Sequence, residues 1–188
     1  MIHIESRIYD YNSNYNLKNK RIMKKILITA LMFVCVCSSY AQKVTYGSFD
    51  VLANEREVCV KLDYTGAMID DLPFDDFLET EDNWDKGNRE ILLKFIKEAN
   101  KEESGILFLT KKETKYILVF KAISVSGRGT TIGYLNLLDN EDNIIAKTDN
   151  FKARGGRFGT QINLMGDAAE SLGEMVGSFI KEQINKRK

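Results

Sequence analysis

The residues best suited to bind a ligand are arginines set among glycines. An Arg-Gly-Gly-Arg run precedes the last predicted helix, and a Gly-Arg-Gly turn lies earlier in the chain. Guanidinium groups bind carboxylates and phosphates, and glycine lets backbone N–H groups turn toward such a ligand. A helix start adds positive potential. We therefore predict an anion-binding site; a flexible surface loop is the alternative. The predicted site residues are Arg128, Arg154, Gly155, Gly156 and Arg157.

A dense run of carboxylates occupies residues 70–85, interleaved with Phe74, Phe77 and Trp84. Such carboxylates can ligate calcium or act as an acid/base pair on a glycan. Their spacing matches no EF-hand loop, and we favour a solvated connection whose aromatic side chains pack on the core. The turn containing Asp139, Glu141 and Asn143 raises the same calcium hypothesis, but turn formation also explains these residue types. We predict no metal site and no catalytic residue.

A third pattern is a ridge of small residues on the last predicted helix. Ala169, Gly173 and Gly177 are spaced four apart and therefore share one helix face. Glycine inside a helix costs about 1 kcal/mol relative to alanine, so two glycines indicate the close approach of another backbone. Packing on a sheet is the favoured explanation, and a groove for a partner helix is the alternative.

The stretch 23–42 has the pattern of an export signal. Two lysines precede an apolar run, and Ser39 and Ala41 occupy the positions read by signal peptidase. The apolar run is short for a membrane anchor, and valine precedes Cys35 and Cys37 where a lipobox has a small residue. We expect a non-native upstream extension at 1–22, a cleaved signal at 23–41 and one domain at 42–188.

Removal of the signal narrows the chemistry open to the protein. Residues 42–188 contain 21 Lys and Arg against 25 Asp and Glu, a net charge of −4, which argues against a nucleic-acid-binding protein. His3, the only histidine, is removed, so triads and histidine-bearing zinc sites are excluded. Cys59 alone remains of three cysteines, and we interpret it as a small buried hydrophobe; a reactive thiol is the alternative. No cofactor is expected.

Periodicity and turn-forming residues predict the strands and helices that carry these residues. Alternating and β-branched runs predict two strands that pair with each other, then a meander of three. Pro73 can open a short helix, and two amphipathic helices follow the helical period. Both faces of the longest strand are apolar in its first half, which indicates a strand covered on both sides or an occupied second surface. The predicted strands are 44–52, 57–64, 115–126, 130–138 and 143–149, and the long helices are 88–101 and 163–184, the latter capped by Asn163.

We therefore predict an α+β domain with a largely antiparallel sheet of about five strands, in the order β-β-α-β-β-β-α, and two helices packed on it. This order, with a meander followed by the helix GDAAESLGEMVGSFIKEQI, resembles the exported α/β domains of Gram-negative envelope-assembly lipoproteins of the curli-secretion and penicillin-binding-protein-activator types. The missing lipobox departs from that pattern and puts an outer-membrane anchor in doubt. The resemblance implies a non-catalytic domain that works through protein contacts.

The resulting functional expectation is an exported, non-enzymatic binding or structural protein of the bacterial envelope, in the periplasm or at the outer surface. Its partner would be another envelope protein or envelope component, and no transmembrane span is expected in the mature chain. Two alternatives stay open. One is a carboxylate-dependent hydrolase, for example of glycans, and the other is a subunit of a larger envelope assembly.

Overall fold

The computed structural model describes residues 42–186 except residue 112. The upstream extension and the signal expected at 1–22 and 23–41 lie outside the described residues. Residues 42–188 belong to one compact unit. No described helix is both long enough and apolar enough to cross a membrane.

The described chain is an α+β fold, as predicted, although its sheet has eight strands where about five were expected. It also contains a third α-helix and a short 3-10 helix. In chain order the elements are β1 (Val44–Gly47), η1 (Asp50–Asn54), β2 (Glu57–Asp63), β3 (Met68–Ile69), β4 (Leu72–Pro73), α2 (Phe74–Thr80), α3 (Trp84–Lys101), β5 (Leu107–Leu109), β6 (Tyr116–Val125), β7 (Thr131–Asp139), β8 (Ile144–Ala153) and α4 (Gln161–Asn185).

The sheet is built around the predicted meander. Strands β6, β7 and β8 pair antiparallel in sequence order, which confirms that part of the prediction. The predicted pairing of the first two strands is wrong: β1 pairs with β8 at one edge, whereas β2 runs parallel to β5 and β6. The first strand ends at Gly47, and η1 then buries Phe49 and Leu52. At η1 the chain crosses from the edge beside β8 to the other side of β6, so the polar turn before β2 does not form a hairpin.

The sequence analysis did not predict strands β3, β4 and β5, which have two or three residues each. They are too short to show alternation. Strands β3 and β4 form a hairpin whose turn residues, Asp70 and Asp71, have φ values of 49° and 65°. Positive φ at both central positions belongs to the mirror-image turns that suit hairpin twist.

The helices lie where the sequence predicted them, but the residues at which they begin differ from the prediction. Helix α2 follows Pro73, as expected. Helix α3 begins at Trp84, four residues before the predicted start. The N-cap of α4 is Thr160, whose side chain accepts a hydrogen bond from the Asn163 N–H, so the predicted Asn163 cap is wrong. Asn163 lies at N3 and is the donor partner of the cap rather than the cap itself.

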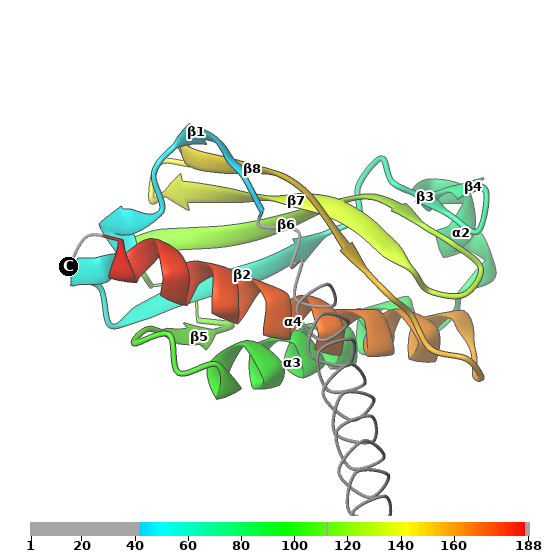
Figure 1. Ribbon diagram of the computed structural model, residues 1–188. Coiled ribbons are helices and arrows are strands. Elements are labelled where there is room, and N and C mark those ends of the chain that lie inside the picture. Colours follow the sequence, from blue (N-terminus) through cyan, green and yellow to red (C-terminus); the bar gives the residue numbers. More distant parts are fainter. Residues whose placement is uncertain (1–41, 112, 187–188) are drawn as a thin grey trace, which may run out of the picture. The chain divides into compact units, whose positions relative to one another are not determined.

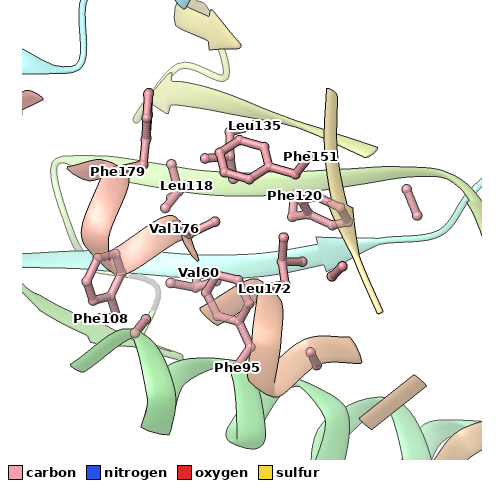
Figure 2. Close-up of a cluster of buried hydrophobic side chains, with 14 of the residues drawn as sticks. Val60, Phe95, Phe108, Leu118, Phe120, Leu135, Phe151, Leu172, Val176 and Phe179 are labelled. Carbon is pink, nitrogen blue, oxygen red and sulfur yellow. The ribbon is translucent and has the colours of Figure 1, made fainter. Parts of the chain in front are cut away.

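Both long helices pack on the same face of the sheet (Figure 1). The core between the two layers contains large side chains from the helices and from the central strands, and Figure 2 shows them directed toward one another. Its buried phenylalanines include Phe49, Phe95, Phe108, Phe120, Phe151 and Phe179. The ring of Phe179 lies edge-on to Phe151, with centroids 5.8 Å apart.

The opposite side of the sheet, here called the open face, is not covered by any described helix. In β6, Leu118 and Phe120 are buried toward the helices, whereas Ile117 and Val119 are only half-buried and Ile123 is 42% exposed. The expectation that this strand is covered on both sides is therefore wrong. A bulge between Ala122 and Ser124 shifts the alternation, so Val125 is buried with the core instead of sharing the face of Ile123.

Cys59 is 1% exposed, which confirms the interpretation as a buried residue. Its backbone N–H donates to Thr114 Oγ1 at 3.1 Å.

The small-residue ridge of α4 contacts helix α3 of the same chain. A Cβ on Gly173 would lie 2.2 Å from the Phe95 carbonyl oxygen, and one on Gly177 would lie 2.6 Å from that of Ala99. Ala169 is also buried. The close approach inferred from the glycines is thus present, but its partner is α3 rather than the sheet. The hypothesis of a partner groove at Ala169, Gly173 and Gly177 is wrong because α3 already fills it.

We expect Gly173→Ala to destabilise the fold by about 1–3 kcal/mol, because the added methyl group must push α3 away from α4. This loss outweighs the gain of about 1 kcal/mol in helix propensity. Urea unfolding of both proteins measures the difference. Glu174→Ala, at the exposed neighbouring position, is the control and should be close to neutral. A stabilised Gly173→Ala variant would contradict the observed helix contact.

Candidate functional site

A pocket of about 660 Å³ lies at one end of the sheet. Three segments meet there: the β3–β4 hairpin, the β6–β7 turn and the loop that joins β8 to α4. The last two carry all the residues of the predicted anion site. Its residues Arg128, Arg154, Gly155, Gly156 and Arg157 all line this one pocket.

A row of register partners across four strands contributes to the pocket wall. Met68 of β3 lies opposite Ser124 of β6, Ser124 opposite Ile132 of β7, and Ile132 opposite Lys152 of β8. All four line the pocket. The sequence analysis did not include Lys152 in the predicted site, although its spacing from Arg154 could have indicated it. It precedes Arg154 by two residues, and side chains at this spacing along an extended chain share a face.

The β6–β7 turn that carries Arg128 is held by hydrogen bonds. The Ser126 hydroxyl oxygen accepts from the N–H groups of Arg128 and Thr130, at 3.3 and 3.2 Å. The Ser126 carbonyl accepts from Gly129 N–H at 2.7 Å and from the side chain of Gln161, at the start of α4, at 2.9 Å. Arg128 is therefore presented by an ordered turn tied to α4.

The glycines of the site permit close packing between segments. A Cβ on Gly155 would lie 2.0 Å from the Arg128 carbonyl oxygen, and one on Gly129 would lie 2.4 Å from the Leu164 carbonyl oxygen. A Cβ on Gly156 would meet the Asp167 carboxylate at 2.1 Å. The sequence argument gave these glycines an N–H-presenting role. The structure instead shows that they let the turn, the loop and α4 touch, which brings the arginines together.

The pocket has an excess of positive charge. Arg128, Lys152, Arg154 and Arg157 line it, and Asp71 is the single carboxylate among its lining residues. None of these four cations lies within 4 Å of a carboxylate in the described part of the chain. Asp167, beside Gly156, is paired with Lys94 instead. An anion can therefore bind without first breaking an ion pair.

Of the carboxylates of residues 70–85, only Asp71 lines this pocket, and the carboxylate of Asp70 packs against Gly127 in the turn that carries Arg128. The aromatic residues between them pack as predicted: Trp84 has edge contacts with Tyr64, Phe74 and Phe77 at 5.2–5.7 Å between ring centroids. Within the described ranges there is no group of three or more His, Cys, Asp or Glu side chains that could hold a metal ion.

The second calcium candidate is a hydrogen-bonded turn. The Asp139 carboxylate accepts from the N–H groups of Glu141 and Asn143, both at 2.9 Å, and from the Asn143 side chain at 3.1 Å. These bonds from Asn143 and Glu141 hold the pKa of Asp139 below its usual value. Turn formation therefore accounts for these residue types.

Next to the pocket, the open face has one ion pair and one cation–aromatic contact. Lys121 Nζ lies 2.8 Å from the Asp63 carboxylate. Burial alone would raise the pKa of Asp63, but hydrogen bonds from Lys121 and Thr65 together outweigh it, and the net pKa is lowered. Lys147 Nζ lies 4.3 Å from the centroid of the Tyr134 ring.

No family model matches this chain, and no curated protein matches it. Among solved structures, the chain is similar to the PelC dodecamer from Paraburkholderia phytofirmans, with 10% identity over 74% of this chain and 96% of that chain and a TM-score of 0.41. It is also similar to a DUF330 protein from Xanthomonas campestris, with 13% identity over 71% of this chain and 88% of that chain and a TM-score of 0.35. At these TM-scores no function is carried over.

We expect Gly155→Ala to destabilise the protein by about 1–3 kcal/mol, because the new methyl group overlaps the Arg128 carbonyl and forces the loop away from the turn. Thermal unfolding tests this directly. Arg157→Ala, an exposed substitution in the same loop, serves as the control and should leave the melting temperature unchanged. Equal melting temperatures for Gly155→Ala and wild type would refute the close contact.

The Asp63–Lys121 pair predicts a pH-dependent contribution to stability. Because the pKa of Asp63 is lowered in the folded state, its stabilisation is complete above the unfolded-state pKa near 3.8 and is lost as the pH falls through the folded-state pKa. The side chain is about a third exposed, so solvent screening limits the effect to about 1 kcal/mol or less. Asp63→Asn should therefore be less stable than wild type at pH 7, and the deficit should be smaller at pH 3. Unfolding free energies at both pH values provide the test, and a deficit that persists unchanged at pH 3 would exclude this mechanism.

Proposed function

We propose that this protein is an exported, non-enzymatic binding protein whose site is the cationic pocket, and that the pocket takes an anionic ligand or the anionic group of a partner. The supporting observation is the convergence of Arg128, Lys152, Arg154 and Arg157 without ion-pair partners in the described chain. Arginine binds carboxylate and phosphate through parallel N–H···O bonds, so three arginines around one pocket favour such groups.

The balance of charge supports this assignment. Residues 42–188 carry a net charge of −4, yet the pocket concentrates four cations with one carboxylate. Like charges held together repel one another, and a bound anion removes that repulsion. The pocket volume, about 660 Å³, lies within the roughly 300–1,000 Å³ usual for small-molecule sites.

Export and an envelope location are part of the same proposal. They rest on the signal pattern at 23–42 and on the resemblance to exported envelope-assembly domains. The partner would then be another envelope protein or an envelope component, and the protein can act as a subunit of a larger assembly.

A carboxylate-dependent hydrolase gains no support from the pocket. Glycoside hydrolysis uses two carboxyl groups about 5–10 Å apart on one cleft. Asp71 is the single carboxylate among the lining residues, so the pocket lacks the second carboxyl group. The geometry therefore favours binding.

The proposal predicts that wild-type protein binds at least one of pyrophosphate, citrate and digalacturonate, and that Arg154→Ala with Arg157→Ala weakens this binding at least about tenfold, as expected for two lost charge-assisted contacts. Isothermal titration calorimetry measures the affinities. Both side chains are exposed, so the melting temperature should not change.

The control removes two positive charges elsewhere. Lys86→Ala with Lys97→Ala lies on exposed positions of α3 and should bind as wild type does. Absence of binding by wild type to all three anions, or equal binding by the arginine double variant, would contradict the proposed function.

A further inference from the structure

We propose that the pocket is one end of a longer binding track and that its ligand is an acidic polysaccharide lying across the open face along β7 and β8. This inference rests on the proposed function of the pocket and extends it to the class of ligand.

The first support is a second group of cations on the open face. The register places Lys61 of β2, Val119 of β6, Asn136 of β7 and Lys147 of β8 in one row across the sheet. The row of residues that lines the pocket and ends at Lys152 crosses β6, β7 and β8 farther along these strands. Lys61, Lys147 and Lys152 have no carboxylate within 4 Å in the described chain. Unneutralised cations thus extend from the pocket along the face.

The acids of this face do not cancel that charge. Among the outward-facing register positions of β2, β6, β7 and β8 in the described chain, the carboxylates are Glu57, at the end of β2 away from the pocket, and Asp63, which is paired with Lys121. Asp149 lies two residues beyond Lys147 in β8. Four lysines occupy such positions: Lys61, Lys121, Lys147 and Lys152. Positive charge along one face, in a domain of net negative charge, is the pattern expected for binding an extended polyanion.

The second support is the presence of two tyrosines on either side of Lys147. Tyr134 of β7 lies beneath its ammonium group, and Tyr46 of β1 is its register partner on the other side. Tyr46 is 60% exposed, although it forms part of an ordered strand. Tyrosine offers a flat apolar ring and a polar tip, which suits a ligand that alternates apolar C–H faces with hydroxyl groups. Sugar rings have this alternation.

Asn136 lies in the same row as Lys147. Its side-chain oxygen is buried without a hydrogen-bond donor in the described structure. A buried polar atom without a partner is uncommon and calls for an explanation. Reorientation of the amide toward a ligand hydroxyl would satisfy it, whereas polyphosphate has no hydroxyl donor of this kind along its chain.

Backbone pairing argues against a peptide in this position. Strands β7 and β8 are hydrogen-bonded to neighbours on both sides, so a peptide lying on the face cannot add as a further strand. A bulge in β8 separates Lys147 from Lys152, and their partners in β7, Asn136 and Ile132, are four residues apart, which corresponds to about 13 Å along a strand. A ligand must therefore be several sugar units long to reach both ends of the track.

The experiment compares four ligands: polygalacturonate, digalacturonate, polyglutamate and neutral dextran. Wild-type protein should bind polygalacturonate more tightly than polyglutamate or dextran, with an affinity that falls as salt rises. Lys61→Gln with Lys147→Gln should weaken polygalacturonate binding about tenfold, the loss expected for two charge contacts, yet leave digalacturonate binding in the pocket unchanged. Tyr46→Ala should weaken polygalacturonate binding more than polyglutamate binding.

Lys86→Gln with Lys97→Gln, on exposed positions of α3, is the charge-matched control and should not weaken polygalacturonate binding. The track is overturned if Lys61→Gln with Lys147→Gln binds polygalacturonate like wild type, if the control variant loses as much affinity, or if polyglutamate binds as tightly. Binding of pyrophosphate or digalacturonate without preference for the longer sugar polymer would retain the proposed pocket and reject the track. Failure of the pocket itself would appear as loss of all small-anion binding.

Discussion

The contact between helices α3 and α4 determines much of this structure. Gly173 and Gly177 remove the side chains that would separate the two backbones, so both helices fit side by side on one face of the sheet. Their apolar sides and the inward residues of β6, β7 and β8 form one core. With both long helices on one face, the side chains on the other face of β6 and β7 stay half-exposed.

Close backbone contact also builds the pocket. Gly155 touches the Arg128 carbonyl, and Gly129 touches the first turns of α4 at Leu164. These contacts bring two arginine-bearing segments, far apart in the chain, to one place. Gathering cations without ion-pair partners is electrostatically unfavourable, and the buried aromatic core provides the stability that allows it. Stability thus comes from the helix side, while the proposed binding surfaces lie at the end of the sheet and on its other face.

Several features followed from local sequence patterns. The meander, the two amphipathic helices, the helix after Pro73 and the buried Cys59 were predictable, because periodicity and turn residues act over short distances. The parallel placement of β2 was not, since it depends on η1 burying Phe49 and Leu52 and carrying the chain across the fold. The sequence also did not show which face of the sheet Val125 occupies, because a bulge shifts the alternation of the strand.

For the site, residue types alone marked the candidates for anion binding, which are arginines and glycines in two turn-forming runs. The folded chain was needed to show that Arg128 lies with Arg154 and Arg157 around one pocket, that Lys152 lines the same pocket, and that most carboxylates of residues 70–85 do not. Charge and backbone freedom are properties of single residues. Their convergence depends on strand register and on contacts between segments distant in the chain.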